Sequence, residues 1–295
     1  MNGILCVDKP QDMTSFSCCA LLRRLTGERK AGHAGTLDPM ATGVLPLMFG
    51  KATRAIPLLP THNKRYRATL QFGKRSDTLD IWGAVSETGH AVPTLSAIED
   101  ALPAFRGEIL QVPPMMSALK KDGVRLYDLA RQGIEIERQA RPITIHTLEV
   151  MTYDDAVGQL QIVCDCSAGT YIRTLCDDLG RVLGCGAVMT ALRREAAAGY
   201  TLAACLTPDD CRRAAEDGSL AEKILPVESA FTVYPAVTVT AAQAVRFRNG
   251  GELAVDRVSG LPKDADIVCI YDPEQIFLGL GRVEEQAIRI VRIFV

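Results

Sequence analysis

The sequence predicts an α/β (α+β) fold with a mixed, largely antiparallel sheet and a small β-rich domain at its C-terminal end. Residues 142–151 (PITIHTLEVM) and 160–166 (LQIVCDC) alternate apolar and polar side chains on either side of a turn-rich stretch, which is typical of adjacent antiparallel strands. Apolar residues recur at helical spacing over 15–25 and 171–183. After Pro226 the pattern changes to short strands separated by turns, which predicts the second domain.

The chain is long enough for two domains. It has 295 residues, of which 47% are hydrophobic, so it can bury a sizeable core. We place the domain boundary near residue 230, which gives domains of residues 1–230 and 231–295. The second domain is expected to contain three short strands, at residues 267–271, 276–280 and 288–294.

The first elements of the N-terminal domain follow from local patterns. Residues 3–7 (GILCV) predict a short strand. A helix over residues 15–25 is expected, with Thr14 or Ser15 as its N-cap. A glycine-rich loop follows, and the segment KRYRATLQFG, which begins at Lys64, alternates like a half-buried strand.

The middle of the chain continues with a strand and helices. Residues 81–86 are expected to pair with the strand that begins at residue 64. Ser96 and Glu99 have the spacing of a capping box, which predicts a helix that stops near Pro103 or Gly107. Two more helices are expected, at residues 171–183, ended by Gly184, and at residues 203–217.

The ten cysteines are predicted to be buried, reduced thiols. Disulfide frameworks belong to small secreted domains, whereas this chain is long and opens without a secretory signal. No CxxC pair supplies the ligand spacing of structural zinc, so no metal is expected. No apolar run approaches the ~20 residues needed to span a bilayer. The sequence therefore predicts a cytoplasmic protein.

The charges are distributed unevenly along the chain. The net charge is -2, which by itself argues against a nucleic-acid binder. Residues 23–75, however, hold eleven lysines and arginines against only Glu28 and Asp38. Such a segment attracts a polyanion, because local field and counterion release govern phosphate binding more than the global charge does. The alternative is a solvated face whose acidic partners come from elsewhere in the fold.

Asp38 lies in the segment AGHAGTLDPMATG, residues 31–43, which has three glycines and one proline and no helical or strand period. These residues indicate a shaped loop. Cations around Asp38 would favour its ionised form, which suits a nucleophile or an electrostatic stabiliser. Taken alone, an Asp-Pro in a glycine-rich loop is more often a turn or a cap. The segment lacks GxxxxGK[ST] and GxGxxG, so it gives little support to nucleotide-phosphate binding.

At these residues the sequence resembles the bacterial tRNA pseudouridine synthase B (TruB) family. The blocks keep the family's order: DKP at 8–10, AGHAGTLDPMATGVLP at 31–46, KRYR at 64–67, RSDTLD at 75–80, SALK at 117–120, ARQGIE at 130–135, RPITI at 141–145, GTYIRTLCDDLG at 169–180 and LRR at 192–194. The C-terminal part, with FRNGGEL at 247–253, resembles more weakly the family's PUA-like RNA-binding module.

The resemblance implies a pseudouridine synthase fold and an enzyme that isomerises the uridine at position 55 of the tRNA T-loop. It implies three catalytic residues. Asp38 matches the aspartate that attacks C1′ of the ribose or works through a glycal intermediate. Tyr66 matches the tyrosine that packs against the target base, and Arg173 matches the arginine that pairs with the aspartate.

The resemblance also implies a set of substrate-binding residues. Besides Tyr66, the matching positions are His33, Tyr171 and Leu192, with Lys9 as the lysine that supports the active-site loop. In isolation, His33 would be a loop histidine, Tyr66 a cross-strand aromatic and Leu192 a core residue. The other three histidines match no functional position, and Trp82 is interpreted as a packing residue.

The resemblance implies an enzyme without a metal or organic cofactor that acts on the T-arm of tRNA. It is expected to be a monomer with no obligate protein partner and no membrane attachment. The competing hypothesis is a non-catalytic tRNA-binding protein or tRNA folding chaperone that uses the same fold. A second alternative is a hydrolase with an aspartate nucleophile that acts on a small phosphate or glycoside.

Overall fold

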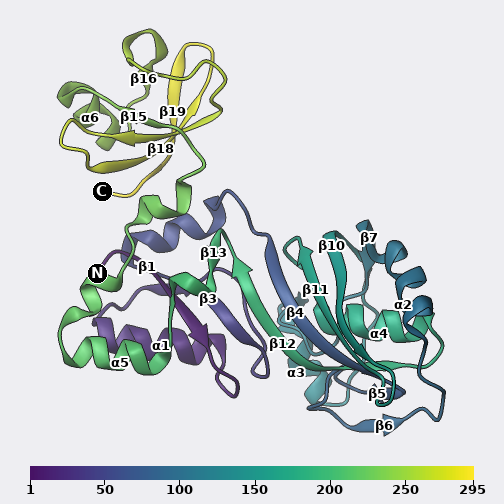
Figure 1. Cartoon of the computed structure of the whole chain (residues 1–295). Coiled ribbons are helices and arrows are strands. Elements are labelled where there is room, and N and C mark those ends of the chain that lie inside the picture. The colour runs from purple at the N-terminus through teal and green to yellow at the C-terminus, as the bar shows by residue number, and fades with distance from the viewer.

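The computed structural model describes the whole chain, residues 1–295, and its largest element is a ten-stranded sheet (Figure 1). Eight strands lie side by side in the order β14 (Cys205–Leu206), β1 (Gly3–Lys9), β3 (Thr42–Phe49), β12 (Ala187–Ala197), β4 (Lys64–Phe72), β11 (Gln159–Cys166), β10 (Arg141–Asp154) and β7 (Gly107–Gln111), while β2 (Ala31–His33) pairs with β3 and β13 (Tyr200–Thr201) with β12. Two pairs, β1–β14 and β3–β12, are parallel and the others are antiparallel. The predicted mixed, largely antiparallel sheet is therefore confirmed.

A second sheet of five strands forms near the C-terminus. Its order is β15 (Ala236–Thr238), β17 (Ile267–Tyr271), β18 (Phe277–Val283), β19 (Ala287–Ile293) and β16 (Leu253–Ala254). Two short hairpins complete the β-structure: β5 (Lys74–Ser76) with β6 (Val85–Glu87), and β8 (Lys120–Lys121) with β9 (Val124–Arg125). The three strands predicted after Pro226 correspond to β17, β18 and β19.

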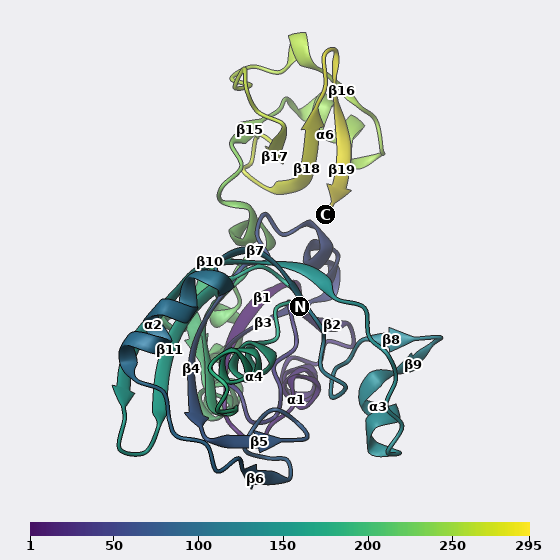
Figure 2. The same ribbon diagram turned by 90° about the vertical axis from the view of Figure 1, so that its right-hand side faces the viewer.

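Six α-helices pack on or beside these sheets (Figures 1 and 2). They are α1 (Ser15–Thr26), α2 (Leu95–Ala101), α3 (Leu126–Arg131), α4 (Ile172–Val182), α5 (Pro208–Glu216) and α6 (Ala241–Arg248). Helix α1 begins at Thr14, whose side chain accepts a hydrogen bond from the Ser17 backbone N–H, as an N-cap does. Buried residues of α1 and α5 pack together with Leu5, Leu45 and Leu47 of β1 and β3.

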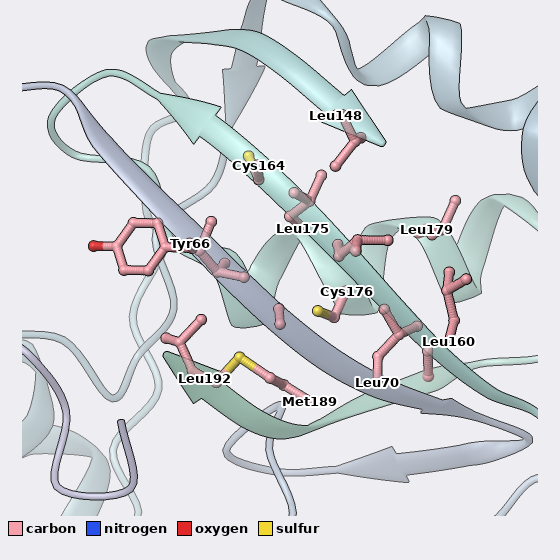
Figure 3. Close-up of a cluster of buried hydrophobic side chains, with 14 of the residues drawn as sticks. Tyr66, Leu70, Leu148, Leu160, Cys164, Leu175, Cys176, Leu179, Met189 and Leu192 are labelled. Carbon is pink, nitrogen blue, oxygen red and sulfur yellow. The ribbon is translucent and has the colours of Figure 1, made fainter. Parts of the chain in front are cut away.

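Helix α4 covers the face of the large sheet that is built by β4, β11 and β12 (Figure 3). Alternate residues of β4, from Tyr66 to Phe72, are buried on this face and pack with Leu175 and Leu179 of α4. The helix approaches β12 very closely, because a Cβ at Gly180 would lie 2.3 Å from the Ala187 nitrogen. This close approach packs the last turn of α4 against β12, and the first residues of the helix reach the functional site.

Residues 81–86 do not pair with β4, contrary to the prediction. Both edges of β4 are already occupied, by β11 on one side and β12 on the other. Strand β6 therefore pairs with β5, and the two form a hairpin that starts where β4 ends.

Two predicted helix starts were also wrong. Helix α2 is capped by Thr94, which accepts from the Ala97 N–H, so Ser96 lies inside the first turn and makes no capping box. Helix α5 starts at Pro208, where Thr207 and Asp210 form a capping box. The preceding residues 205–206 instead form β14, which pairs with β1.

The two sheets share one hydrophobic cluster, in which Phe231 lies between them. Its ring centroid is 6.2 Å from that of Phe277 and 5.8 Å from that of Phe294, and the same cluster contains Ile4 and Val44 of the large sheet. The domain boundary near residue 230 therefore stays a prediction.

Nine of the ten cysteines are buried, as predicted, and none forms a disulfide. None of the helices has both the length and the apolar character that crossing a membrane requires.

Candidate functional site

A cavity of about 430 Å³ lies where the 34–38 loop meets β4, β12 and the start of α4. This volume is in the usual range for sites that hold a small molecule or a single nucleoside-sized group. The polar and aromatic lining residues include Asp38, His62, Lys64, Tyr66, Ser117, Thr170, Tyr171 and Arg173, and the apolar ones include Ile56, Met189 and Leu192.

Asp38 and Arg173 form the charged centre of this cavity. The Arg173 Nη2 atom lies 2.9 Å from Asp38 Oδ2. The Asp38 side chain remains 37% exposed, whereas that of Arg173 is only 6% exposed. The guanidinium therefore holds the carboxylate from within the protein and leaves it open to a molecule in the cavity.

A second carboxylate, from Asp80, lies on the other side of Arg173. Its Oδ2 atom is 3.7 Å from Arg173 Nη1, and its side chain is 7% exposed. Asp80 Oδ1 accepts hydrogen bonds from Thr78 Oγ1 at 2.8 Å and from the Trp82 backbone N–H at 3.0 Å. Arg173 thus pairs with two carboxylates. That of Asp38 is open to the cavity, and that of Asp80 is buried.

Arg173 is positioned by the start of α4. The helix begins after Tyr171, whose backbone N–H donates to Gln111 Oε1 at 2.8 Å and whose carbonyl accepts from Gln111 Nε2 at 3.0 Å. Arg173 Nη2 also donates to the Met116 carbonyl at 2.6 Å. The arginine is therefore held by β7, by the segment after it and by its own helix, as well as by its carboxylate partners.

Burial raises the pKa of Asp38 above its ordinary value. The neighbouring Arg173 and Lys9 oppose this shift, and Asp80 adds to it. The sequence predicted that surrounding cations would favour the ionised form. These cations are present, but the removal of Asp38 from water has the larger effect on its pKa, which therefore rises.

Three buried side chains hold the loop that carries Asp38. Ser15 Oγ donates to the Leu37 carbonyl at 3.1 Å and accepts from the Leu37 N–H at 2.8 Å. Lys9 Nζ donates to the carbonyls of Pro10, Met13 and Pro39 at 2.9, 2.6 and 3.2 Å. Leu37, before Asp38, is therefore fixed to α1, and Pro39, after it, is fixed to β1.

Arg194 is the third of these side chains and is completely buried on β12. Its three guanidinium nitrogens donate to the carbonyls of Val44, Thr36 and Gly35 at 2.8, 3.3 and 3.1 Å. Gly43, at φ +106°, lets β3 pass close to it, because a Cβ there would lie 2.1 Å from the Arg194 carbonyl oxygen.

We expect Lys9→Met to destabilise the protein by about 2 to 4 kcal/mol, because three carbonyls lose their buried donor. The Asp38 loop also loses a fixed point, so catalytic rate should fall more than substrate affinity. Urea unfolding and steady-state kinetics measure the two effects. An unchanged unfolding free energy would contradict this role of Lys9.

The stability difference between wild type and Lys9→Met should also depend on pH. Burial lowers the pKa of Lys9 to about 8, below its value in the unfolded chain. The unfolded state therefore binds more protons between about pH 8 and pH 10.5, so the contribution of Lys9 grows as pH rises through this window. If the difference in unfolding free energy between wild type and Lys9→Met shrank as pH rises through this window, the lowered pKa of Lys9 would be contradicted.

Tyr66 projects from β4 at the cavity end of the core in Figure 3, with Leu192 and Met189 beside it. Its side chain is nearly buried, and burial raises the pKa of Tyr66 to about 12. The phenol is therefore neutral at physiological pH and presents an aromatic ring rather than a charge.

The cavity brings together five of the seven residues predicted for the site: Asp38, Tyr66, Tyr171, Arg173 and Leu192. His33 and Lys9 do not line it. His33 is half-buried at the end of β2, and its Nδ1 atom is buried without a partner. Lys9 is completely buried and supports the loop, so it cannot touch a molecule in the cavity.

Sequence reasoning missed four residues of the site. His62 lines the cavity although it matched no functional position. Asp80 and Arg194 lie in the RSDTLD and LRR blocks, which could have indicated them. Gln111 carried no signal, because its role depends on the backbone of a residue far along the chain.

The basic segment 23–75 is partly neutralised by residues from other strands. Arg65 pairs with Asp165 at 2.6 Å, and Arg67 pairs with Glu195 at 2.7 Å. Lys74 pairs with Glu87 at 3.1 Å. The alternative of a solvated face with partners from elsewhere therefore holds for these three cations. Another group remains exposed: Arg23, Arg24, Arg29, Lys30, Lys51 and Arg54.

Three family models match the chain. Residues 23–172 match the TruB family pseudouridylate synthase N-terminal domain, residues 173–232 the tRNA pseudouridylate synthase B C-terminal domain, and residues 235–293 the pseudouridine synthase II TruB C-terminal domain.

Similar full-length proteins carry the name tRNA pseudouridine synthase B. The protein of Dehalococcoides mccartyi (strain CBDB1) is 42% identical, over 96% of this chain and 93% of its own length. The protein of Mannheimia succiniciproducens is 40% identical, over 96% of this chain and 92% of its own length. The protein of Clostridium acetobutylicum is 37% identical, over 99% of this chain and 99% of its own length. Among solved structures, a chain of a Cbf5-Nop10-Gar1 complex is 26% identical with a TM-score of 0.74, over 99% of this chain and 85% of its own.

Proposed function

The chain belongs to the TruB family of pseudouridylate synthases, and we propose that it isomerises the uridine at position 55 of the tRNA T-loop to pseudouridine. The observation that carries this proposal is the Asp38–Arg173 pair, which is open to a cavity beside Tyr66. The names of the similar proteins support tRNA as the substrate.

The reaction moves one bond and leaves the composition of the RNA unchanged. The N1–C1′ glycosidic bond of uridine breaks, the uracil turns in the site, and C5 forms a new bond to C1′. The hydrogen of C5 is lost and N1 gains one. No net oxidation or reduction occurs, so the chemistry depends on a carboxylate that acts on the ribose and on control of the free uracil.

Asp38 is proposed to act on the ribose as a carboxylate, either by attack at C1′ or by the route through a glycal. Both routes need an ionised group held at one place. Arg173 supplies orientation and a positive charge, and Asp80 fixes Arg173 from behind. The fixed loop prevents Asp38 from turning away, because its neighbours are bonded to Ser15 and Lys9.

Tyr66 is proposed to receive the uracil after the uridine has left its stack. Flipping a base out of the RNA costs its stacking contacts, and an aromatic ring replaces some of them. Since the phenol stays neutral, it carries no negative charge that would compete with Asp38 for Arg173. Leu192 and Met189 close the apolar side of the cavity.

The pH dependence of activity follows from the raised pKa of Asp38. The carboxylate is the active form, so kcat/KM should fall as pH decreases through that pKa, at a higher pH than for an ordinary aspartate. Asp80→Asn removes a negative neighbour that raises the pKa of Asp38, so the acidic limb of the kcat/KM profile should move to lower pH. A profile measured from about pH 4 to about pH 8 tests this. A limb that moves upward in Asp80→Asn would contradict the assignment.

RNA affinity should fall steeply as salt is raised, because exposed cations release counterions from the phosphates. The ion pairs divide the basic segment into two groups with different expected effects. Neutralising Lys51 or Arg54, which are exposed, should reduce the slope of log affinity against log salt by about one each if they contact phosphates. The matched change Arg65→Gln should alter the slope less, because Asp165 already neutralises Arg65. Equal effects would contradict this division.

Tritium release tests the proposed function. A tRNA transcript labelled at C5 of uridine loses one tritium when C5 bonds to C1′. We expect release from the normal transcript and none from a transcript in which the T-loop uridine is replaced by cytidine. Release from both, or from neither, would contradict the proposal.

A further inference from the structure

The turn between β5 and β6 presents the single tryptophan of the chain to solvent. Trp82 is 47% exposed, and its neighbours Ile81 and Val85 are each 38% exposed. The interpretation of Trp82 as a packing residue was therefore wrong. The hairpin therefore exposes an indole and two aliphatic side chains to solvent.

The turn that carries Trp82 is fixed by its own side chains. Asp80 Oδ1 accepts from the Trp82 N–H at 3.0 Å, and Asp77 Oδ1 accepts from the Ala84 N–H at 2.8 Å. A Cβ at Gly83 would lie 2.2 Å from Asp77 Oδ1, so the turn is also tightly closed. Trp82 is thus held in place at its backbone while its ring remains exposed.

The turn adjoins the cavity. Asp80 Oδ2 lies 3.7 Å from Arg173, and the backbone on either side of Asp80 bonds to Met189, a residue of the cavity wall. Two residues of chain span at most about 7 Å, so the backbone of Trp82 lies close to Asp80, the residue that pairs with Arg173 from behind.

We propose that Trp82 stacks on an unpaired base of the RNA substrate next to the flipped uridine. This inference rests on the proposed function. When one base leaves the stack, its neighbours expose a face that had been covered, and an indole can cover it regardless of base identity. Arg75, exposed on the same hairpin, supplies a cation for the adjoining phosphate.

A base fits this surface better than a protein partner does. Stable protein interfaces bury roughly 1,200 Å² or more in total. The exposed apolar surface here consists of three side chains on one tight turn, which is far smaller. One indole can cover one base, and the turn that carries it is bonded to Met189 of the cavity wall, which suits a base that neighbours the target.

Because Trp82 is the only tryptophan, fluorescence excited at the red edge of indole absorption, where the seven tyrosines do not absorb, reports on it alone. We expect T-arm RNA to quench the emission of the wild-type protein, with a midpoint equal to the Kd from the anisotropy of labelled RNA. Unchanged emission at saturating RNA, with binding seen by anisotropy, would overturn the inference and leave the proposed function standing. No binding by either measurement would contradict both. An emission change produced by raising protein concentration alone would show self-association and would also overturn it.

Substitutions separate stacking from simple apolar contact. Trp82→Ala should raise the Kd for RNA by about 5- to 100-fold, the range expected for one stacked base. Trp82→Phe should retain most of the affinity, and Trp82→Leu should resemble Trp82→Ala because it has no aromatic face. Thermal unfolding checks that all three variants fold as wild type does. Full affinity in Trp82→Leu would overturn the proposal.

Discussion

We expect Asp38→Asn to lower pseudouridine formation by at least about four orders of magnitude, because loss of a nucleophile removes the chemical step itself. Asparagine has the same shape and can still accept a hydrogen bond from Arg173, so the loop should keep its place. Binding of tRNA should change by no more than about twofold, since the phosphate contacts lie elsewhere. Single-turnover tritium release and RNA anisotropy measure the two quantities.

Asp165→Asn is the matched control for this experiment. It removes an aspartate that is also paired with an arginine, Arg65, but lies outside the cavity lining. It should leave single-turnover rates near those of wild type. If Asp38→Asn retained turnover within about tenfold of wild type, Asp38 would not be the group that acts on the ribose.

Arg173→Met should have the second largest effect, on stability as well as rate. It leaves Asp38 and Asp80 without their shared cation, and Asp80 is almost fully buried. Removing one partner of a buried ion pair costs about 3 to 5 kcal/mol. Urea unfolding should show this loss, and the rate should fall because Asp38 is neither oriented nor held ionised.

The double variant Arg173→Met with Asp80→Asn separates the two effects. Neutralising Asp80 removes the buried charge that Arg173→Met leaves behind, so part of the stability should return. Activity should not return, since Asp38 still lacks its arginine. Recovery of activity together with stability would mean that Arg173 supports folding alone. An Arg173→Met protein as stable as wild type would contradict the buried-pair description.

The sequence predicted four of the ten strands of the large sheet, β1, β4, β10 and β11, and the last three were found because their side chains alternate clearly. Residues 142–151 and 160–166 became β10 and β11, and residues 64–72 became β4. Strand β12 was missed because its first three residues are all buried and its register with β4 shifts twice, between Met189 and Ala191 and between Arg194 and Ala196, which interrupts the alternation. The pairing of residues 81–86 was wrong because a local pattern does not show that both edges of β4 are taken.

Site residues that lie in sequence motifs were predictable, whereas contacts between residues far apart along the chain were not. Asp38, Tyr66 and Arg173 come from three separate blocks, and the resemblance to the TruB family implied that they meet in one site, as they do in the cavity. The RSDTLD and LRR blocks could have indicated Asp80 and Arg194 as residues, but not their contacts with Arg173 and with the loop that carries Asp38. The excess charge of residues 23–75 was overestimated for the same reason, because Asp165 and Glu195 lie more than 90 residues away along the chain.

The most direct test of the central claim is to incubate the protein with an unmodified tRNA transcript and map pseudouridine at nucleotide resolution. We predict one new pseudouridine, at position 55 of the T-loop, with wild-type protein and none with Asp38→Asn. A transcript that stays unmodified at that position, or that gains pseudouridine only elsewhere, would contradict the proposed function.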